Sequence, residues 1–140
     1  IGPVTTDISL IHDIPNIHIL GPKSYSSIPN YLKGFDVATI PFIIHDVTLR
    51  ASPVKFYEYL ASGTPIVATR LPDLEKFDHL VDLFSRPDQY VESLDKALTD
   101  KSTTALNKRL AEAGKHSWES RFEKIDELID HALAKLEPSK

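Results

Sequence analysis

The sequence signal that most constrains the fold is a marked helix that leads directly into a buried strand, in residues 50–69. This stretch reads Arg-Ala-Ser-Pro-Val-Lys-Phe-Tyr-Glu-Tyr-Leu-Ala-Ser-Gly-Thr-Pro-Ile-Val-Ala-Thr. Ser52 is a good N-cap, and Pro53 suits the first helical position because its missing N–H costs nothing there. Gly63 suits the left-handed residue that closes a helix. The continuous apolar run at 66–68 then predicts a strand that is covered on both faces.

The predicted helix has an apolar face and a polar face, since each residue turns the chain by about 100°. The apolar face holds Val54, Tyr57 and Ala61 with Leu60 beside them, and the polar face holds Lys55, Glu58 and Ser62. Glu58 lies at the border, so we expect its carboxylate to face a cleft. The helix N-terminus, with free N–H groups and about half a positive charge, points at the same cleft. This pairing suits a ribose joined to a diphosphate, although a solvated face with a Lys/Glu pair would carry the same residues.

Two stretches of the chain resemble one enzyme family. Residues 52–69 resemble the donor-binding signature of family 4 glycosyltransferases, also described as glycosyl transferases group 1, which have the two-Rossmann-domain GT-B fold. Residues 20–41 resemble the strand, turn, short helix and Asp-Val-x-x-x-Pro strand that precede the signature in that family. The resemblance covers most of residues 1–85. It implies that the chain is a large part of the C-terminal, donor-binding half of a GT-B enzyme.

The resemblance also implies which residues of this helix bind the donor. In the family, a glutamate at the place of Glu58 holds the ribose hydroxyls of a nucleotide sugar. The start of the same helix, here Ser52, Pro53 and Val54, touches the diphosphate or the sugar through backbone groups. Lys55 is a candidate counter-charge for the diphosphate and, with equal weight, a surface residue.

The turn after the predicted strand at 17–20 is a second candidate contact region. In the family this loop lies against the nucleobase, which makes Gly21, Pro22 and Lys23 candidates for base contact. A plain strand-ending turn accounts for these three residues equally well.

Arg50 is the point where the chain departs from the family. Most members place another glutamate eight residues before the ribose glutamate, where it touches sugar hydroxyls or supports charge that develops at C1. A guanidinium at this position could bind a donor phosphate or an acidic sugar, or it could pair with Asp46. Arg50 is therefore the candidate catalytic residue, with its role left open between these alternatives.

Strand and helix signals alternate at short spacing along the chain. Strands are predicted at 17–20, 37–40, 66–68 and 80–84, with helices between them that Ser26 or Ser27 and Ser52 can cap. This order predicts an α/β fold, a Rossmann-like parallel sheet with helices on both faces. Ligands of such sheets bind beyond the carboxyl ends of the strands. The loop at 42–51 must cross that edge, so we expect it to be the mobile lip of the site.

Three further helices are predicted, from Pro87, from Ser102 or Thr103, and after Ser117. On the first, the inner side is predicted to hold Tyr90, Val91, Leu94, Ala97 and Leu98. The last carries an apolar seam with alternating spacings of four and three, formed by Trp118, Phe122, Ile125, Ile129, Ala132 and Leu136. We expect this seam to pack on its own domain rather than to form a coiled-coil dimer, and the resemblance implies that the helix returns to the N-terminal domain. The predicted organisation is a nucleotide-sugar-binding domain at 1–115 and a C-terminal helix at 116–140 packed on it.

Composition narrows the classes of function. The 140 residues, 41% of them hydrophobic, can form one domain with a core, and a net charge of −4 gives no sign of a nucleic-acid surface. Cys is absent, which excludes disulfides and zinc–thiolate sites and suits a cytoplasmic protein. The six His residues lack metal-ligand spacing, so no metal site is predicted. Met is absent too, so we expect a piece of a longer protein whose N-terminal acceptor domain is missing. If the whole protein associates peripherally with a membrane, we expect the missing half to make that contact.

The function implied by the resemblance is retaining transfer of a sugar from a nucleotide-diphosphate sugar to a glycan or other acceptor, with no cofactor and no obligatory metal. Because the acceptor half is missing, we expect the isolated chain to bind nucleotide weakly and to transfer nothing. Two alternatives stay open, a nucleotide-sugar 2-epimerase of the same fold and a non-catalytic Rossmann-like assembly module.

Overall fold

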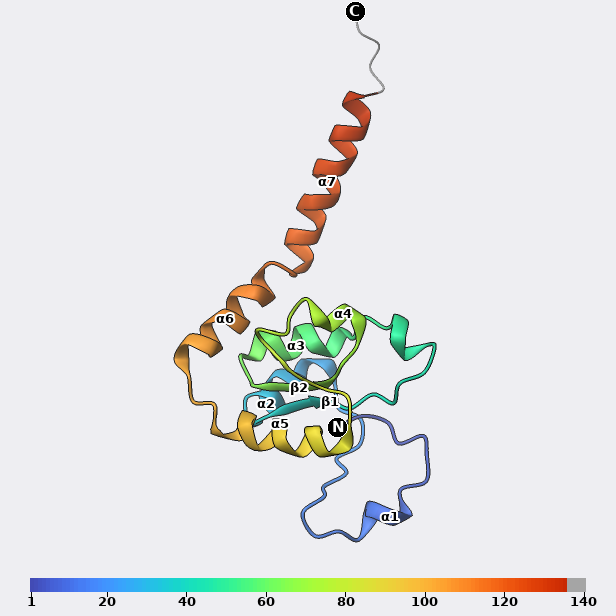
Figure 1. Cartoon of the computed structure of the whole chain (residues 1–140). Helices are drawn as coiled ribbons and strands as arrows, with labels where there is room; N and C mark the ends of the chain where they lie inside the picture. Colours follow the sequence, from blue (N-terminus) through green and yellow to red (C-terminus); the bar gives the residue numbers. More distant parts are fainter. Residues whose placement is uncertain (136–140) are drawn as a thin grey trace, which may run out of the picture. The chain divides into compact units, whose positions relative to one another are not determined.

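The computed structural model describes residues 1–135 and divides into two compact units, residues 1–34 and the part of the chain from Phe35 onward. Figure 1 shows the helices and strands of both. The chain is an α/β protein, as the alternation of strand and helix signals predicts.

The first unit contains short helical turns and no strand. Its elements are α1 (Ser9–His12), the 3-10 turn η1 (Tyr25–Ser27) and α2 (Ile28–Leu32). The predicted strand at 17–20 is therefore wrong. A strand of a parallel sheet needs a hydrogen-bonded neighbour, and within residues 1–34 the segment 17–20 is exposed and lies in no ladder. One backbone hydrogen bond near it joins the N–H of Gly2 to the carbonyl oxygen of Gly21 at 3.0 Å.

The second unit is built on a three-stranded parallel sheet in the order β1-β2-β3. The strands are β1 (Ala38–Ile40), β2 (Ile66–Thr69) and β3 (Asp82–Phe84). Thr39 pairs with Val67, and Ala68 pairs with Leu83. All four residues of the central strand β2 are buried, which confirms the strand that its continuous apolar run predicts. The other two are confirmed as well, shorter by one or two residues than predicted.

Helices cover both faces of this sheet. They are α3 (Val54–Ser62), the short α4 (Pro72–Glu75), α5 (Pro87–Thr99), α6 (Thr103–Gly114) and α7 (Trp118–Ala134), and a 3-10 turn η2 (Thr48–Arg50) precedes α3. Figure 1 shows α3 on one face of β1 and β2 and α5 on the other. The predicted Rossmann-like layering is therefore confirmed for the second unit.

The core packs one face of α3 against the sheet and α4, and that face is not the predicted one. Phe56 and Leu60 are fully buried, whereas Val54 is 71% exposed. The ring of Phe56 lies 4.9 Å from that of Phe77, centroid to centroid. Two apolar stripes are available on this helix, and the sheet buries the one that contains Phe56, which has no polar group, whereas Tyr57 carries a hydroxyl that needs a hydrogen-bond partner or water. Tyr57, predicted to face inward, is half-buried and packs instead against the Phe77 and His116 rings.

Gly63 ends α3 in the predicted left-handed conformation, with φ of 74°. Its N–H donates to the carbonyl oxygen of Leu60 at 3.0 Å. A Cβ at this position would also lie 3.1 Å from Cγ of Leu106 on α6. Both the positive φ and the close approach of α6 therefore call for glycine.

Arg109 on α6 forms a hydrogen bond to the C-terminal end of α3, a contact that sequence reasoning missed. It is 6% exposed, its Nε donates to the carbonyl oxygen of Gly63 at 2.9 Å, and its guanidinium lies 3.3 Å from Asp100 Oδ2. A cation at a helix C-terminus also interacts favourably with the helix dipole. The apolar-periodicity pattern gave no signal for a buried arginine, because the acceptor lies 46 residues away.

Replacement of Arg109 by Met is expected to destabilise the fold by about 2 kcal/mol. It leaves the Gly63 carbonyl without its side-chain donor and the Asp100 carboxylate without its ion-pair partner, while the methionine keeps most of the packing. Urea denaturation measures the free energy of unfolding. Replacement of the neighbouring, exposed Lys108 by Met is the control and should change it by less than about 0.5 kcal/mol.

The last two helices begin at the predicted capping residues. Ser102 Oγ accepts the N–H of Ala105 at 3.2 Å, and Ser117 Oγ accepts the N–H of Ser120 at 3.2 Å. Both capping predictions are confirmed.

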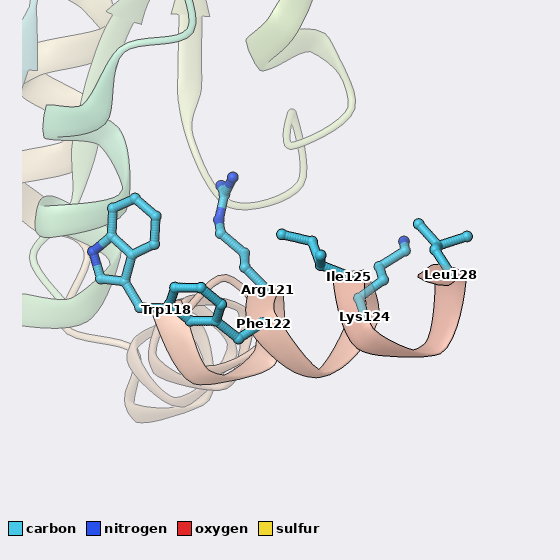
Figure 2. A pocket seen from close by; sticks show the side chains of 6 residues that line it. All are labelled: Trp118, Arg121, Phe122, Lys124, Ile125 and Leu128. Carbon is cyan, nitrogen blue, oxygen red and sulfur yellow. The ribbon is translucent and has the colours of Figure 1, made fainter. Parts of the chain in front are cut away.

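The apolar seam of α7 is not covered by the described part of the chain. No residue of α7 is buried, and Trp118 is 75% exposed. At its first turns the helix touches the domain through Arg121, whose guanidinium carbon lies 5.5 Å from the centre of the Tyr57 ring. Figure 2 shows a groove along the helix, which is lined by Trp118, Arg121, Phe122, Lys124, Ile125 and Leu128. Leu136, the last predicted seam residue, lies outside the described residues, and the predicted boundary between domain and helix stays a prediction.

Candidate functional site

The carboxyl ends of the three strands define one edge of the sheet in the second unit. At this edge Thr69 Oγ1 donates to the carbonyl oxygen of Phe42 at 2.8 Å, and the N–H of Arg70 donates to the carbonyl oxygen of Phe84 at 2.7 Å. Because β1 and β2 are parallel, α3 must run back between them, and its N-terminus lies at this edge. Ligands of open parallel sheets bind at this edge, so α3 brings its first turn to the expected place.

The start of α3 carries no side-chain cap. The N-cap position is occupied by Pro53, with φ of −69° and ψ of 111°, and the helix begins at Val54. The predictions that Ser52 caps this helix and that Pro53 is its first helical residue are therefore wrong. No capping side chain uses the amide groups of the first turn, so they stay available to an anion.

Ser52 forms a hydrogen bond to Asp73 on α4 and does not cap the helix. The Ser52 hydroxyl donates to Asp73 Oδ2 at 2.7 Å, and Lys76 Nζ donates to Asp73 Oδ1 at 2.7 Å. A hydrogen bond to a charged carboxylate is stronger than one to a neutral group, so the hydroxyl turns to α4. Sequence reasoning missed Asp73, and the signal that could have found it is an acidic residue directly after Pro72, in the first turn of a helix.

The pKa of the Asp73 carboxyl is lowered, mainly by the hydrogen bond from Lys76; burial opposes this effect, and the hydrogen bond from Ser52 adds to it. A carboxyl whose folded-state pKa lies below its unfolded value stabilises the fold above that unfolded value, about 3.9 for Asp. The stabilisation is lost as the pH falls through the folded-state pKa.

Asp73 is therefore expected to contribute about 1 kcal/mol or less at neutral pH, because its side chain is 30% exposed. The contribution should begin to decrease below about pH 4 and disappear as the pH falls through the lowered folded-state pKa. Urea denaturation of the native protein and of Asp73→Asn at pH 6 and at pH 3 measures it. The two proteins should differ more at pH 6 than at pH 3, and an equal difference at both pH values would contradict the expectation.

Glu58 is half-buried on α3, one turn from the helix start, which is about 6 Å along the axis from Val54. Among residues 1–135, no group donates a hydrogen bond to its carboxylate or forms an ion pair with it. The Lys55–Glu58 pair expected of a plain solvated face is thus not formed, and Lys55 is exposed. Burial raises the pKa of the neighbouring Tyr59, and the charge of Glu58 raises it further. The carboxylate is therefore free to accept hydroxyl groups of a ligand.

The loop between β1 and α3 has internal order. Thr48 Oγ1 donates to the carbonyl oxygen of Ile43 at 2.7 Å and accepts the N–H of His45 at 2.9 Å. Arg50 ends η2, is exposed, and within the described residues forms no ion pair with Asp46. The role of Arg50, whether catalytic, donor-binding or structural, stays a prediction.

The three residues predicted to contact the base lie in the first unit. Gly21 has φ of 64°, and the exposed Lys23 places Nζ 5.8 Å from the centre of the Tyr31 ring. Pro22 between them is exposed. Base contact by these residues stays a prediction.

Residues 1–135 contain neither a cluster of metal-binding side chains nor a membrane-spanning helix. Three or more His, Asp or Glu side chains gather nowhere in this range in a way that could hold a metal ion. None of the helices in the same range combines the length and the hydropathy needed to cross a membrane.

Comparison with known proteins gives two matches. The model of the family described as "Glycosyl transferases group 1" matches residues 2–100. TuaH of Bacillus subtilis (strain 168), whose full name is "Putative teichuronic acid biosynthesis glycosyltransferase TuaH", is 31% identical over 80 residues. That alignment covers 54% of this chain and 20% of TuaH, so the chain matches about a fifth of its relative's length. No solved structure matches.

Proposed function

Because this chain belongs to the family of glycosyl transferases group 1, we propose that it binds the nucleotide-sugar donor of a retaining glycosyltransferase. In this proposal it forms a large part of the C-terminal half of a cytoplasmic GT-B enzyme. The donor loses its sugar to a glycan or another acceptor, and the nucleoside diphosphate departs.

One observation carries the proposal. The uncapped start of α3 lies at the carboxyl edge of the sheet, and Glu58, whose carboxylate has no partner among residues 1–135, lies one turn further along the same helix. The first-turn amides of Val54 and Lys55 suit a diphosphate, which is an anion. The Glu58 carboxylate suits the two ribose hydroxyls, which are hydrogen-bond donors. A nucleoside diphosphate has both groups at neighbouring positions.

The chemistry asked of these residues is mainly electrostatic. Negative charge grows on the diphosphate as its bond to the sugar C1 breaks, and donors that are already aimed at it stabilise the transition state. The backbone from Ser52 to Val54, across Pro53, supplies the positive end of the helix, and Lys55 supplies a mobile cation. Glu58 fixes the ribose and so places the bond that breaks. The guanidinium of Arg50 adds a second cation for the phosphates or for an acidic sugar.

The acceptor is proposed to bind to an N-terminal half of the same protein. The exposed seam of α7, with its groove around Trp118 and Phe122, is proposed to pack against that half, as the resemblance implies. Peripheral membrane association would run through the same half. The isolated chain is therefore expected to bind nucleotide weakly and to transfer no sugar, with no cofactor involved.

Titration of the chain with UDP, GDP and ADP, followed by backbone amide chemical shifts, tests the proposal. At least one nucleotide should shift the amides of residues 54–58, and Gly21 and Lys23 should shift only if the base lies against them. If no nucleotide moves residues 54–58 at millimolar concentration, the proposal fails and the non-catalytic assembly module is favoured. Measurable sugar transfer by the isolated chain would contradict the assignment of the acceptor to another part of the protein.

A further inference from the structure

The hydroxyl of Ser52 has two competing partners. A Ser-Pro pair at a helix start ordinarily places the serine at the N-cap and the proline at the first helical position, with the hydroxyl on the amides two and three residues later. Those amides would be Val54 and Lys55. In the structure the same hydroxyl instead donates to Asp73 Oδ2 at 2.7 Å, and the helix starts one residue later without a cap.

The surroundings of Asp73 hold its carboxylate in a position that favours the hydrogen bond from Ser52. It stands on α4 between Leu71 and Leu74, which are both fully buried in the core, so its backbone is firmly held. Its second oxygen accepts Lys76 Nζ at 2.7 Å, which orients the carboxylate. The carboxylate therefore presents Oδ2 to Ser52 with little loss of conformational freedom.

We propose that Asp73 is a positioning residue that keeps the start of α3 open by holding the hydroxyl that would otherwise cap it. The role rests on the proposed function, in which the first-turn amides bind the donor diphosphate. With Asp73 in place, these amides face the ligand unpaired. Without it, Ser52 occupies them, and a diphosphate must displace the cap before it binds.

Amide hydrogen exchange of the whole chain without ligand tests the core of this proposal. Asp73→Ala is expected to slow exchange at Val54 and Lys55 about fivefold, because a cap of typical strength then protects them. Ser52→Ala is expected to leave exchange at these amides as in the native protein, because the native serine does not cap. The double variant Asp73→Ala/Ser52→Ala should also exchange at the native rate.

The return of the exchange rate to its native value in the double variant distinguishes a positioning role of Asp73 from a merely structural one. A general loosening of α4 would speed exchange in Asp73→Ala, and removal of a second side chain would not restore it. Glu75→Ala is the matched control, since Glu75 shares the first turn of α4, is exposed and lies 4.0 Å from Arg70 rather than near Ser52. It should leave the amides of α3 unchanged. The proposal is overturned if Asp73→Ala folds and its Val54 and Lys55 amides exchange at the native rate. It is also overturned if these amides exchange faster in Ser52→Ala than in the native protein. The Ser52→Ala measurement decides the matter if Asp73→Ala does not fold.

Binding of inorganic pyrophosphate gives the functional readout, independent of the base and the sugar. Asp73→Ala should bind it about fivefold more weakly than the native chain. The double variant should bind it more tightly than Asp73→Ala, because Ser52 takes part in the proposed site through its backbone, which alanine keeps. Loss of affinity in Asp73→Ala without recovery in the double variant would overturn the proposal. If the exchange pattern holds but the native chain does not bind pyrophosphate, the positioning contact stands and the donor site proposed above fails.

Discussion

Replacement of Glu58 by Gln is expected to weaken nucleotide binding by roughly 50-fold. Hydrogen bonds to a charged acceptor contribute more than those to a neutral one, and two ribose hydroxyls on one carboxylate account for about 2 to 3 kcal/mol. The substitution preserves shape and helix propensity, and the side chain has no other partner among residues 1–135 whose loss could disturb the fold. Amide chemical shifts on titration with the nucleotide that binds best measure the effect.

Two controls make the Glu58 result specific. Inorganic pyrophosphate has no ribose, so Glu58→Gln should bind it as well as, or slightly better than, the native chain. Replacement of Glu92, an exposed carboxylate on α5, by Gln should leave nucleotide binding unchanged. If Glu58→Gln binds the nucleotide with native affinity, the carboxylate does not hold the ribose and the main support for the proposed function is lost.

Replacement of Phe56 by Ala is expected to have the largest effect on stability, about 3 to 5 kcal/mol. The side chain has no exposed surface and its ring packs against Phe77 and Tyr57, at centroid distances of 4.9 and 5.5 Å. Its removal leaves a cavity between α3 and the core that these rings cannot fill without losing their own contacts. A loss of this size is a large part of the 5 to 15 kcal/mol that typically holds a domain folded.

The free energy of unfolding in urea checks this prediction. Val91→Ala on α5 is a useful comparison, because periodicity predicts Val91 on the inner side of its helix whereas it is 57% exposed. That variant should lose less than about 1 kcal/mol. If Val91→Ala were as damaging as Phe56→Ala, the packing faces described for the two helices would be wrong.

A transferase and an epimerase of this fold differ in whether the reaction requires an acceptor. Membership of the glycosyl transferases group 1 family favours the transferase, and the groove and exposed seam on α7 suit the proposed second half of the protein that would bring the acceptor. Analysis of products formed by the full-length protein separates the two, since an epimerase needs no acceptor. Release of a changed sugar nucleotide in the absence of any acceptor would favour the epimerase.

Features that depend on neighbours within about four residues could be read from the sequence. Gly63 ends α3, and Ser102 and Ser117 cap their helices, because each residue acts on backbone groups beside it. The order of strands and helices follows from the same local signals, and with it the parallel sheet and the position of the α3 N-terminus at its carboxyl edge. The same local signals place Glu58 on α3, whereas its role in donor binding is implied by the family resemblance and stays a prediction.

Only the tertiary structure decided the features whose partners lie far along the chain. Asp73 takes the hydroxyl of Ser52 across 21 residues, and Arg109 reaches the carbonyl of Gly63 across 46. The segment 17–20 has strand-like residues but no ladder within its own unit. On α3 the sheet buries Phe56 rather than Val54. In each case the local pattern allows more than one arrangement, and only the contacts within the folded chain decide which one forms.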